Sequence, residues 1–442
     1  MGIIAALRDT AIPVIVYLVM IGVVVAGVFW RAELPVILLA VFAPLPTLWY
    51  ATHGFPLATD AIDLLVMSAA IGVIVNKGGY QKTPLSIIVF ATILYTYISL
   101  WISAIGFNLP MPISLDNPFL KAWKNYALIF LIYYVGFNSI RTENQVKLLI
   151  NSCIAVLAFM VFQEVRGFSA GDSYSHGRRS DGPFWIVGLN ANHFASFLCY
   201  VGLFAFGQFL FAGKSKRAWI YLFIYLSSLY PLMFSYSRGA YVASLAGLIF
   251  FAFMRNRRLA FLLILFALFW KDILPATVIE RIEMTEGSGG GLDDSSAFRL
   301  EVWELAIALF RDNLFAGIGF NGFIVASQGM KLHDTHNFYL KIAAEQGLLG
   351  LFLWFAFIVG VGIKAWSLFR HSFLLYSKGC GFATLGCLVG VLVCNLFGDR
   401  FSQIEISVVL VLLFAAMQRQ GLIDSRSIEL GDAVVPQRNT PN

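Results

Sequence analysis

Residues 85–105 read LSIIVFATILYTYISLWISAI, a run of 21 residues without a charged side chain. An α-helix needs about 20 apolar residues to cross the roughly 30 Å hydrocarbon core of a bilayer. No water is present there to hydrogen-bond an exposed backbone, so a spanning segment of this kind must be helical. The stretch therefore predicts a transmembrane helix.

Composition extends this prediction to the whole chain. Of its 442 residues, 59% are hydrophobic and only 13% are charged, whereas a soluble domain carries about 25% charged residues. We expect helices at 11–30, 34–50, 61–75, 85–105, 126–138, 146–165, 189–212, 219–234, 240–254, 259–273, 348–363, 381–396 and 406–417. These thirteen segments predict an all-α polytopic membrane protein with 12 or 13 transmembrane helices.

The basic residues indicate orientation rather than nucleic-acid binding. The formal net charge is +6, but the basic side chains lie in short loops between apolar runs and not on one surface. Cytoplasmic loops carry an excess of Lys and Arg. This rule places two loops inside, one with Lys214, Lys216 and Arg217 and one with Arg255, Arg257 and Arg258. Residues 166–188, the turn around Arg238 and residues 275–346 then lie outside.

This topology divides the chain into four regions. Residues 1–273 form an N-terminal transmembrane bundle, and 274–346 form one long extracytoplasmic loop that carries the chemistry. Residues 347–418 supply the C-terminal transmembrane helices, and 419–442 are a disordered cytoplasmic tail. Loops as long as 274–346 tend to be functional or disordered.

The long loop has helical signals of its own. A Gly/Ser linker at 287–291 precedes potential N-cap residues and a helix at 297–311. Phe298, Val302, Leu305 and Leu309 give that helix one apolar face, which could lie on the membrane surface. A second helix begins at His336 and leads into the next membrane span.

The cysteines do not indicate a disulfide, a metal site or a cofactor. All five lie in apolar segments, and none has the CxxC spacing of a zinc or redox site. Cys380, Cys387 and Cys394 recur every seven residues, which is typical of small residues at a helix-packing seam.

Arginines gather at the predicted outer boundary, where positive charge is disfavoured. Arg238 lies between two apolar runs, where a charge is costly unless it is paired or used. Arg299 lies near the start of its helix, with Trp303 one turn later, and helix N-termini favour phosphate. Both arginines suit an anion site. The alternatives are an interfacial Arg238 and an Arg299 paired with a nearby carboxylate.

His336 is the candidate general base. It stands in Asp334-Thr335-His336-Asn337, where Asp334 or Thr335 would cap the following helix, and a helix N-terminus disfavours the imidazolium form. A neutral imidazole can accept a proton near pH 7. Metal ligation by His333 and His336, or a purely structural role, remains an alternative.

A third polar cluster enters a membrane helix. Arg178 and Arg179 are followed by Asn190-Ala191-Asn192-His193, which could extend the anion pocket or form a solvated loop with an Asn cap. No nucleotide-binding loop and no serine nucleophile elbow occurs in the sequence.

Together these segments resemble the O-antigen ligase and polymerase family of bacterial envelope glycosyltransferases. The resemblance rests on Ser-Arg-Gly-Ala at 237–240, on Arg299-x-x-x-Trp303 followed by Asn-Leu-Phe-Ala-Gly-Ile-Gly at 313–319, and on His336-Asn337 followed by Glu-Gln-Gly-Leu-Leu-Gly at 345–350. It implies a GT-C type helical architecture in the bacterial inner membrane, with the active site facing the periplasm.

The resemblance also implies the substrates. The donor is a glycan on undecaprenyl pyrophosphate, with its lipid tail between helices, and the acceptor is lipid A core or another glycan. Arg238 and Arg299 would hold the pyrophosphate, and His336 would activate the acceptor hydroxyl. Arg179, Asn192, Trp303 and Asn337 are possible further contacts. No metal is required, and the anomeric carbon is inverted.

Several functions remain open at this stage. An O-antigen ligase transfers the glycan to lipid A core, a polymerase transfers it to another lipid-linked repeat unit, and a third enzyme of this type would modify a protein hydroxyl. A transporter or flippase is the alternative from another class. Transporters tend to place ionisable residues at mid-membrane and to contain inverted repeats, whereas the charges here gather at one face.

Overall fold

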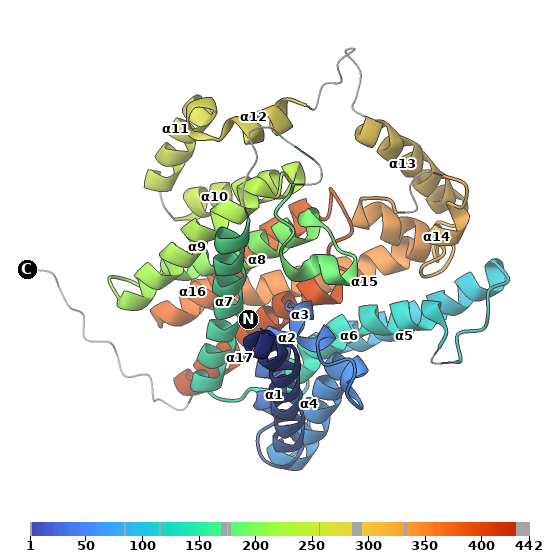
Figure 1. Ribbon diagram of the computed structural model, residues 1–442, viewed down its shortest axis with the longest axis horizontal. Helices are drawn as coiled ribbons and strands as arrows, with labels where there is room; N and C mark the ends of the chain where they lie inside the picture. The colour runs from blue at the N-terminus through green and yellow to red at the C-terminus, as the bar shows by residue number, and fades with distance from the viewer. Residues whose placement is uncertain are drawn as a thin grey trace, which may run out of the picture.

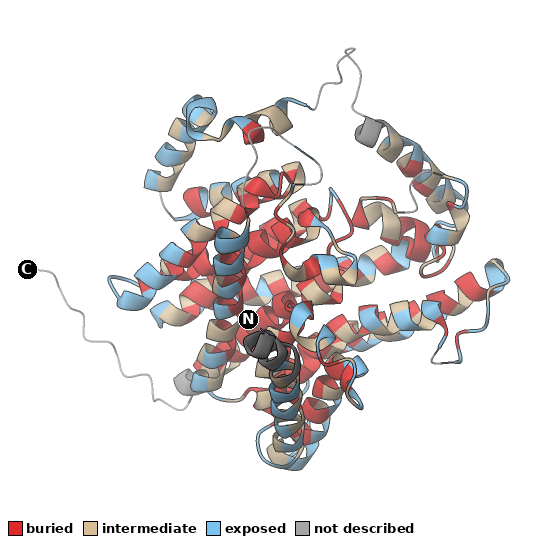
Figure 2. Cartoon of the chain, in the orientation of Figure 1, coloured by how far each residue is buried: buried red, intermediate tan, exposed pale blue. Residues whose placement is uncertain are grey.

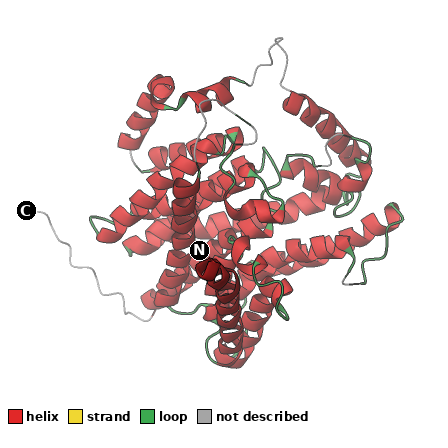
Figure 3. Ribbon diagram, viewed as in Figure 1, coloured by secondary structure: helices red, strands yellow, loops and turns green. Residues whose placement is uncertain are grey.

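The computed structural model describes residues 2–83, 85–114, 116–168, 175, 178–255, 257–284, 294–330 and 334–429, which contain helices and no strand (Figures 1 and 3). The helices are α1 (Gly2–Phe29), α2 (Glu33–Phe42), α3 (Pro46–Tyr50), η1 (Ala58–Asp60), α4 (Ala61–Lys77), α5 (Ser86–Gly106), α6 (Pro118–Ser139), α7 (Glu143–Gly167), η2 (Gly182–Val187), α8 (Ala191–Phe209), α9 (Lys216–Phe234), α10 (Arg238–Met254), α11 (Arg257–Ile273), α12 (Ala276–Glu283), α13 (Asp294–Asp312), α14 (Phe323–Ala326), α15 (Phe338–His371), α16 (Leu375–Cys394) and α17 (Ile404–Glu429). The predicted all-α polytopic membrane fold is confirmed.

Each of the thirteen predicted segments overlaps at least one helix of the structure. Seven helices of the described chain are long and apolar enough to cross a membrane, or eight if the bent pair α11 and α12 is one span. The apolar helices α2 and α10, with 10 and 17 residues, are shorter than a full crossing. The number of 12 or 13 transmembrane helices stays a prediction.

The predicted single helix at 34–50 is wrong in detail, because the chain breaks between α2 and α3. Pro46 begins α3, and a proline disfavours helical geometry in the residue before it. Leu45 accordingly has φ −116° and ψ 69°. The linker predicted at 287–291 lies outside the described residues, as does His333.

The C-terminal helix α17 lies in the middle of the fold. Its residues 406–420 are all buried, and it packs against α6 and α7. Helix α16 packs against α8, α10 and α15, and burial concentrates where these helices meet (Figure 2). Helix α11 has no buried residue and lies at the edge of the molecule (Figures 1 and 2). The first and last parts of the chain thus build one bundle.

The boundary of the predicted disordered tail is corrected by the structure. Helix α17 continues through Arg419 to Glu429. The Arg419 side chain is buried and donates hydrogen bonds to the carbonyl of Phe137 at 2.5 and 3.0 Å and to Oε1 of Gln81 at 2.8 Å. A buried guanidinium needs such acceptors, and they hold the start of this segment in the bundle. Residues 430–442 lie outside the described chain.

Helix α13 packs on protein and not with its apolar face on the membrane surface. Val302 and Ala306 are buried with Phe323 and Ala344, and Leu305 and Leu309 pack beside them. Residue Ala344 belongs to α15, so α13 is fixed along the first turns of that helix. The predicted apolar face is therefore confirmed, but its partner is another part of the same chain.

A break inside α15 is held by residues 313–322. Gly347 has φ 63° and ψ −160°, which interrupts the helix. The segment after α13 supplies hydrogen bonds to this break: Ile318 N donates to Ala344 O at 2.9 Å, Gly319 N to Glu345 O at 2.8 Å, and Leu348 N to Leu314 O at 2.9 Å. Because buried backbone groups must be paired, this segment replaces the helix bonds that the break removes.

The close approach at Gly319 leads to a stability prediction. Gly319 has φ 99°, and a Cβ there would overlap the backbone nitrogen of Ser103 in α5. Gly329 has nearly the same φ, 96°, but open space around its Cβ position. We expect Gly329→Ala to lower the free energy of unfolding by about 1 kcal/mol through backbone strain alone. Gly319→Ala should cost clearly more, because a backbone atom must move as well.

Thermal unfolding of the two purified variants in detergent tests this difference. Equal losses of thermal stability would show that the contact between Gly319 and α5 is not needed to hold the break.

Candidate functional site

The turn that enters α15 presents His336. Asn337 caps the helix, with its Oδ1 accepting from Tyr339 N at 3.0 Å and Leu340 N at 3.2 Å. Asp334 and Thr335, which we had predicted as caps, are instead bonded within the turn. Thr335 Oγ1 accepts from Asn337 N at 3.2 Å, and Asp334 Oδ1 accepts from His336 N at 3.3 Å. His336 has a positive φ of 48°, which is uncommon for a residue other than glycine and clusters at functional sites.

Trp303 fixes this turn from outside. Its indole Nε1 donates to the carbonyl oxygen of Thr335 at 2.7 Å. Since Trp303 belongs to α13, the bond ties the position of α13 to that of His336.

Electrostatics keep His336 in its neutral form. Burial lowers the pKa of His336 below its ordinary value, Arg299 and Arg400 lower it further, and Asp334 opposes them. The Asp334 carboxylate lies 3.4 Å from Nδ1. A proton on Nδ1 faces this carboxylate, so that Nε2 is left as the basic nitrogen. The imidazole is 30% exposed and therefore open to a substrate.

Arg400 binds a second histidine in the same region. The Arg400 guanidinium lies 2.8 Å from Nε2 of His193, and Nδ1 of His193 lies 3.0 Å from Oδ1 of Asn190. Because an arginine is always protonated and can only donate, Nε2 of His193 accepts this hydrogen bond. His193 is thus a neutral acceptor that holds Arg400. Burial lowers the pKa of Arg400, and the acidic neighbours Asp334 and Asp399 raise it.

Arg179 and Asn192 are joined directly. Arg179 donates from its Nη2 to Oδ1 of Asn192 at 2.7 Å and from Nε to the carbonyl of Ser235 at 2.7 Å. Asn192 directly precedes His193 in the chain, so the pair of Arg179 and Asn192 adjoins the pair of His193 and Arg400. Ser235 lies three residues before Arg238, so the hydrogen bond from Arg179 to Ser235 connects these side chains to the segment that leads into α10.

Arg238 is the first residue of α10 and is half-buried. The next residue, Gly239, lies against Phe397, because a Cβ at position 239 would be 2.6 Å from Cβ of Phe397. Phe397 is three residues from Arg400. The start of α10 therefore packs against the loop between α16 and α17 that carries Arg400.

Arg299 lies in the second turn of α13 and not in the first, because the helix begins at Asp294. It is half-buried, and its charge acts on His336. The predicted residues His336, Arg299, Trp303 and Asn337 thus meet at the entry to α15. Arg179 and Asn192 join them through His193 and Arg400.

The sequence interpretation missed how central the α16–α17 loop is. Asn395 accepts from Arg400 N at 3.2 Å and Phe401 N at 3.1 Å through its Oδ1, and its carbonyl accepts from Phe338 N at 3.0 Å. Asp399 pairs with Lys341 at 2.7 Å. The sequence signal was present as Asp399-Arg400 between two apolar helices.

These groups suit chemistry on an anionic substrate. The charges of Arg299 and Arg400 act on the imidazole of His336, which can accept a proton while the arginines stabilise negative charge. Among the described residues, no group of three or more His, Cys, Asp or Glu side chains is arranged to hold a metal ion.

Residues 221–355 match the family model described as O-antigen ligase. The matched region runs from α9 into α15 and contains Arg238, Arg299, Trp303, His336 and Asn337, whereas Arg179 and Asn192 precede it. None of the curated proteins matches the chain.

The acidic neighbour of His336 leads to a prediction about its protonation. Asp334 opposes the lowering of the pKa of His336 by burial, Arg299 and Arg400. Asp334→Asn keeps the shape but removes this charge, so the pKa of His336 should fall further and the neutral form should persist to lower pH. The pH dependence of diethyl pyrocarbonate modification at His336, followed by peptide mass spectrometry, measures this shift.

His371 is the internal control, because it is exposed at the far end of α15. The extent of modification at His371 should be the same in the wild type and in Asp334→Asn. An upward shift at His336 would contradict the assigned role of Asp334.

Proposed function

Because residues 221–355 match the family model described as O-antigen ligase, we propose that the protein is a GT-C type glycosyltransferase that moves a glycan from undecaprenyl pyrophosphate to an acceptor hydroxyl. The acceptor in this proposal is lipid A core, which makes the protein an O-antigen ligase. It would act in the bacterial inner membrane with its site facing the periplasm.

The observation that carries this proposal is a neutral histidine surrounded by arginines. Arg299 and Arg400 act electrostatically on His336, and Arg238 begins a helix packed against the loop of Arg400. A base must be unprotonated to work, while a pyrophosphate needs fixed positive charge. Burial lowers the pKa of His336, and Arg299 and Arg400 lower it further, so the base can stay unprotonated beside fixed positive charge.

The reaction step follows from these roles. The acceptor hydroxyl gives its proton to Nε2 of His336, and its oxygen forms a bond to the anomeric carbon of the donor sugar. The bond between that carbon and the pyrophosphate oxygen breaks, and its electron pair leaves with undecaprenyl pyrophosphate. Attack from the face opposite the leaving group inverts the anomeric carbon.

The arginines act on the leaving group. Arg238 and Arg299 hold the pyrophosphate and stabilise the negative charge that grows on it, for which bidentate guanidinium bonds are well suited. We assign no step to a metal ion. Asp334 is a positioning residue, because it faces Nδ1 of His336 at 3.4 Å and fixes which nitrogen is basic. Arg179, Asn192, Trp303 and Asn337 support the site through the contacts described above.

Reconstituted transfer tests the proposal. Undecaprenyl-pyrophosphate glycan and lipid A core from the native host are mixed with the purified protein in detergent with EDTA. We expect core-linked glycan with the wild type. His336→Ala should lower the rate by about 10²- to 10⁴-fold through loss of the base. Arg238→Ala and Arg299→Ala should each lower it by about 10²- to 10³-fold through loss of charge stabilisation.

Two residues at the other end of α15 give matched controls. His371→Ala and Arg370→Ala remove the same side-chain types from exposed positions in the last turn of the helix, and both variants should retain wild-type rates. If the assay yields longer lipid-linked chains and no core-linked product, the protein is a polymerase and not a ligase. Glycan on protein would identify a protein glycosyltransferase, and no transfer to any acceptor would favour a transporter.

A further inference from the structure

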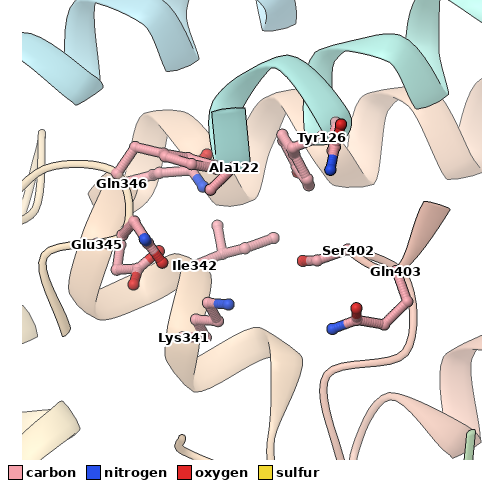
Figure 4. Close-up of a pocket in the computed structure, with 11 residues that line it drawn as sticks. Ala122, Tyr126, Lys341, Ile342, Glu345, Gln346, Ser402 and Gln403 are labelled. Carbon is pink, nitrogen blue, oxygen red and sulfur yellow. The ribbon is translucent and has the colours of Figure 1, made fainter. Parts of the chain in front are cut away.

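A polar cavity of about 240 Å³ lies beside the candidate site (Figure 4). It is lined by the first turns of α6 and of α15, by Phe320 and Asn321 of the segment that holds the α15 break, and by Ser402 and Gln403 of the α16–α17 loop. Four parts of the chain that are far apart in sequence thus meet around it. None of its lining residues belongs to the site as predicted from the sequence.

Several polar side chains of this cavity have no hydrogen-bond partner among the described residues. Tyr126 is only 3% exposed, and no partner is present for its hydroxyl. The side-chain amide of Gln346, a residue that is also 3% exposed, has none either. The same holds for the side chain of Gln403, which lies with Ser402 across the cavity from Lys341 and Ile342 (Figure 4), whereas the Ser402 hydroxyl is hydrogen-bonded to the carboxylate of Asp399. These groups are open to the cavity, where a polar occupant can form hydrogen bonds with them.

The charged groups at the cavity are already satisfied within the protein. Lys341 pairs with Asp399 at 2.7 Å, and Glu345 accepts from the backbone N–H of Phe323 at 3.3 Å. Lys341 and Glu345 therefore both have partners inside the protein. What remains open is a set of neutral donors and acceptors from hydroxyl and amide groups, which fits a ligand rich in hydroxyl groups better than an anion.

Two segments of the chain carry both cavity residues and residues of the candidate site: the start of α15 and the α16–α17 loop. Lys341 lies about one helical turn, roughly 5 Å along the axis, after the first residue of α15, and His336 lies just before that residue. In the α16–α17 loop, Arg400 faces His193 and His336, whereas Ser402 and Gln403 line the cavity. A ligand in the cavity would thus lie next to the place where glycosyl transfer is proposed.

We propose that this cavity is a subsite for one sugar ring of a glycan substrate, whose hydroxyl groups bond to Tyr126, Gln346 and Gln403. This inference rests on the proposed function and specifies part of its substrate recognition. The volume supports a single ring, because pockets for drug-sized ligands begin at about 300 Å³. The ring belongs either to the donor glycan or to the acceptor, and both present the same chemistry.

Three substitutions test the subsite without removing any group assigned to the reaction. Tyr126→Phe removes one hydroxyl, Gln403→Met removes one amide at similar size, and Ala122→Phe places a ring at the cavity wall. Equilibrium binding of the isolated donor and of the isolated acceptor is measured separately for each variant in nanodiscs, and KM and kcat are measured in the transfer assay. Tyr126→Phe and Gln403→Met should weaken binding of one substrate about 2- to 10-fold. Ala122→Phe should weaken it more.

Tyr225→Phe is the matched control. Its hydroxyl is also buried without a hydrogen-bond partner among the described residues, but Tyr225 lies in α9 and does not line the cavity. This variant should bind both substrates like the wild type and should unfold at a temperature similar to that of Tyr126→Phe.

The substrate whose binding weakens identifies the source of the ring. A higher KM for that substrate with nearly unchanged kcat supports a binding subsite. Unchanged binding of both substrates in all three cavity variants would overturn the inference and leave a water-filled cavity. Because binding is measured without turnover, a wild-type protein that binds but transfers nothing would overturn the proposed function and leave the subsite standing.

Discussion

The hydrogen bonds across the α15 break are the interaction on which the rest of this site depends. A helix interrupted inside a protein leaves carbonyl and N–H groups that must find new partners. Residues 314–319 provide them, and the Tyr95 hydroxyl adds a bond to the carbonyl of Gln346 at 2.6 Å. Each of these bonds joins segments that are distant in sequence, so the break fixes α5, α13 and α15 relative to one another.

The position of the reactive groups follows from that arrangement. Residues 313–322 directly follow α13, so their bonds to α15 also hold α13 beside the first turns of α15. Val302 and Ala306 of α13 pack there with Ala344 of α15. This places Trp303 within reach of Thr335 and Arg299 beside His336. A motif of glycines and apolar residues, with no reactive side chain of its own, therefore determines the geometry of the groups to which we assign the reaction.

The α16–α17 loop completes the site from the other side. Its Asn395 bonds the start of α15 and the backbone of Arg400, so the two helix ends are joined as one unit. Asp399 and Arg400 then point to different neighbours, one to Lys341 and the other to His193. The loop lies between the region of Arg299, Arg400 and His336 and the polar cavity at Gln403, which agrees with the proposal of a pyrophosphate on one side and a sugar ring on the other.

The sequence by itself determined where most helices lie, because uncharged runs such as 85–105 have no other stable structure in a bilayer. It singled out Arg238 because a charge between apolar runs is costly, and Arg299 and His336 because helix N-termini favour phosphate and a neutral imidazole. It did not determine the end of α17, because the acceptors that bury Arg419 come from residues nearly 300 positions earlier. Nor did it determine that Asn337 caps α15, that His193 holds Arg400, or that Tyr126 and Gln403 share a cavity. Those facts depend on side chains brought together by packing, and local sequence patterns carry no information about which distant group will be the partner.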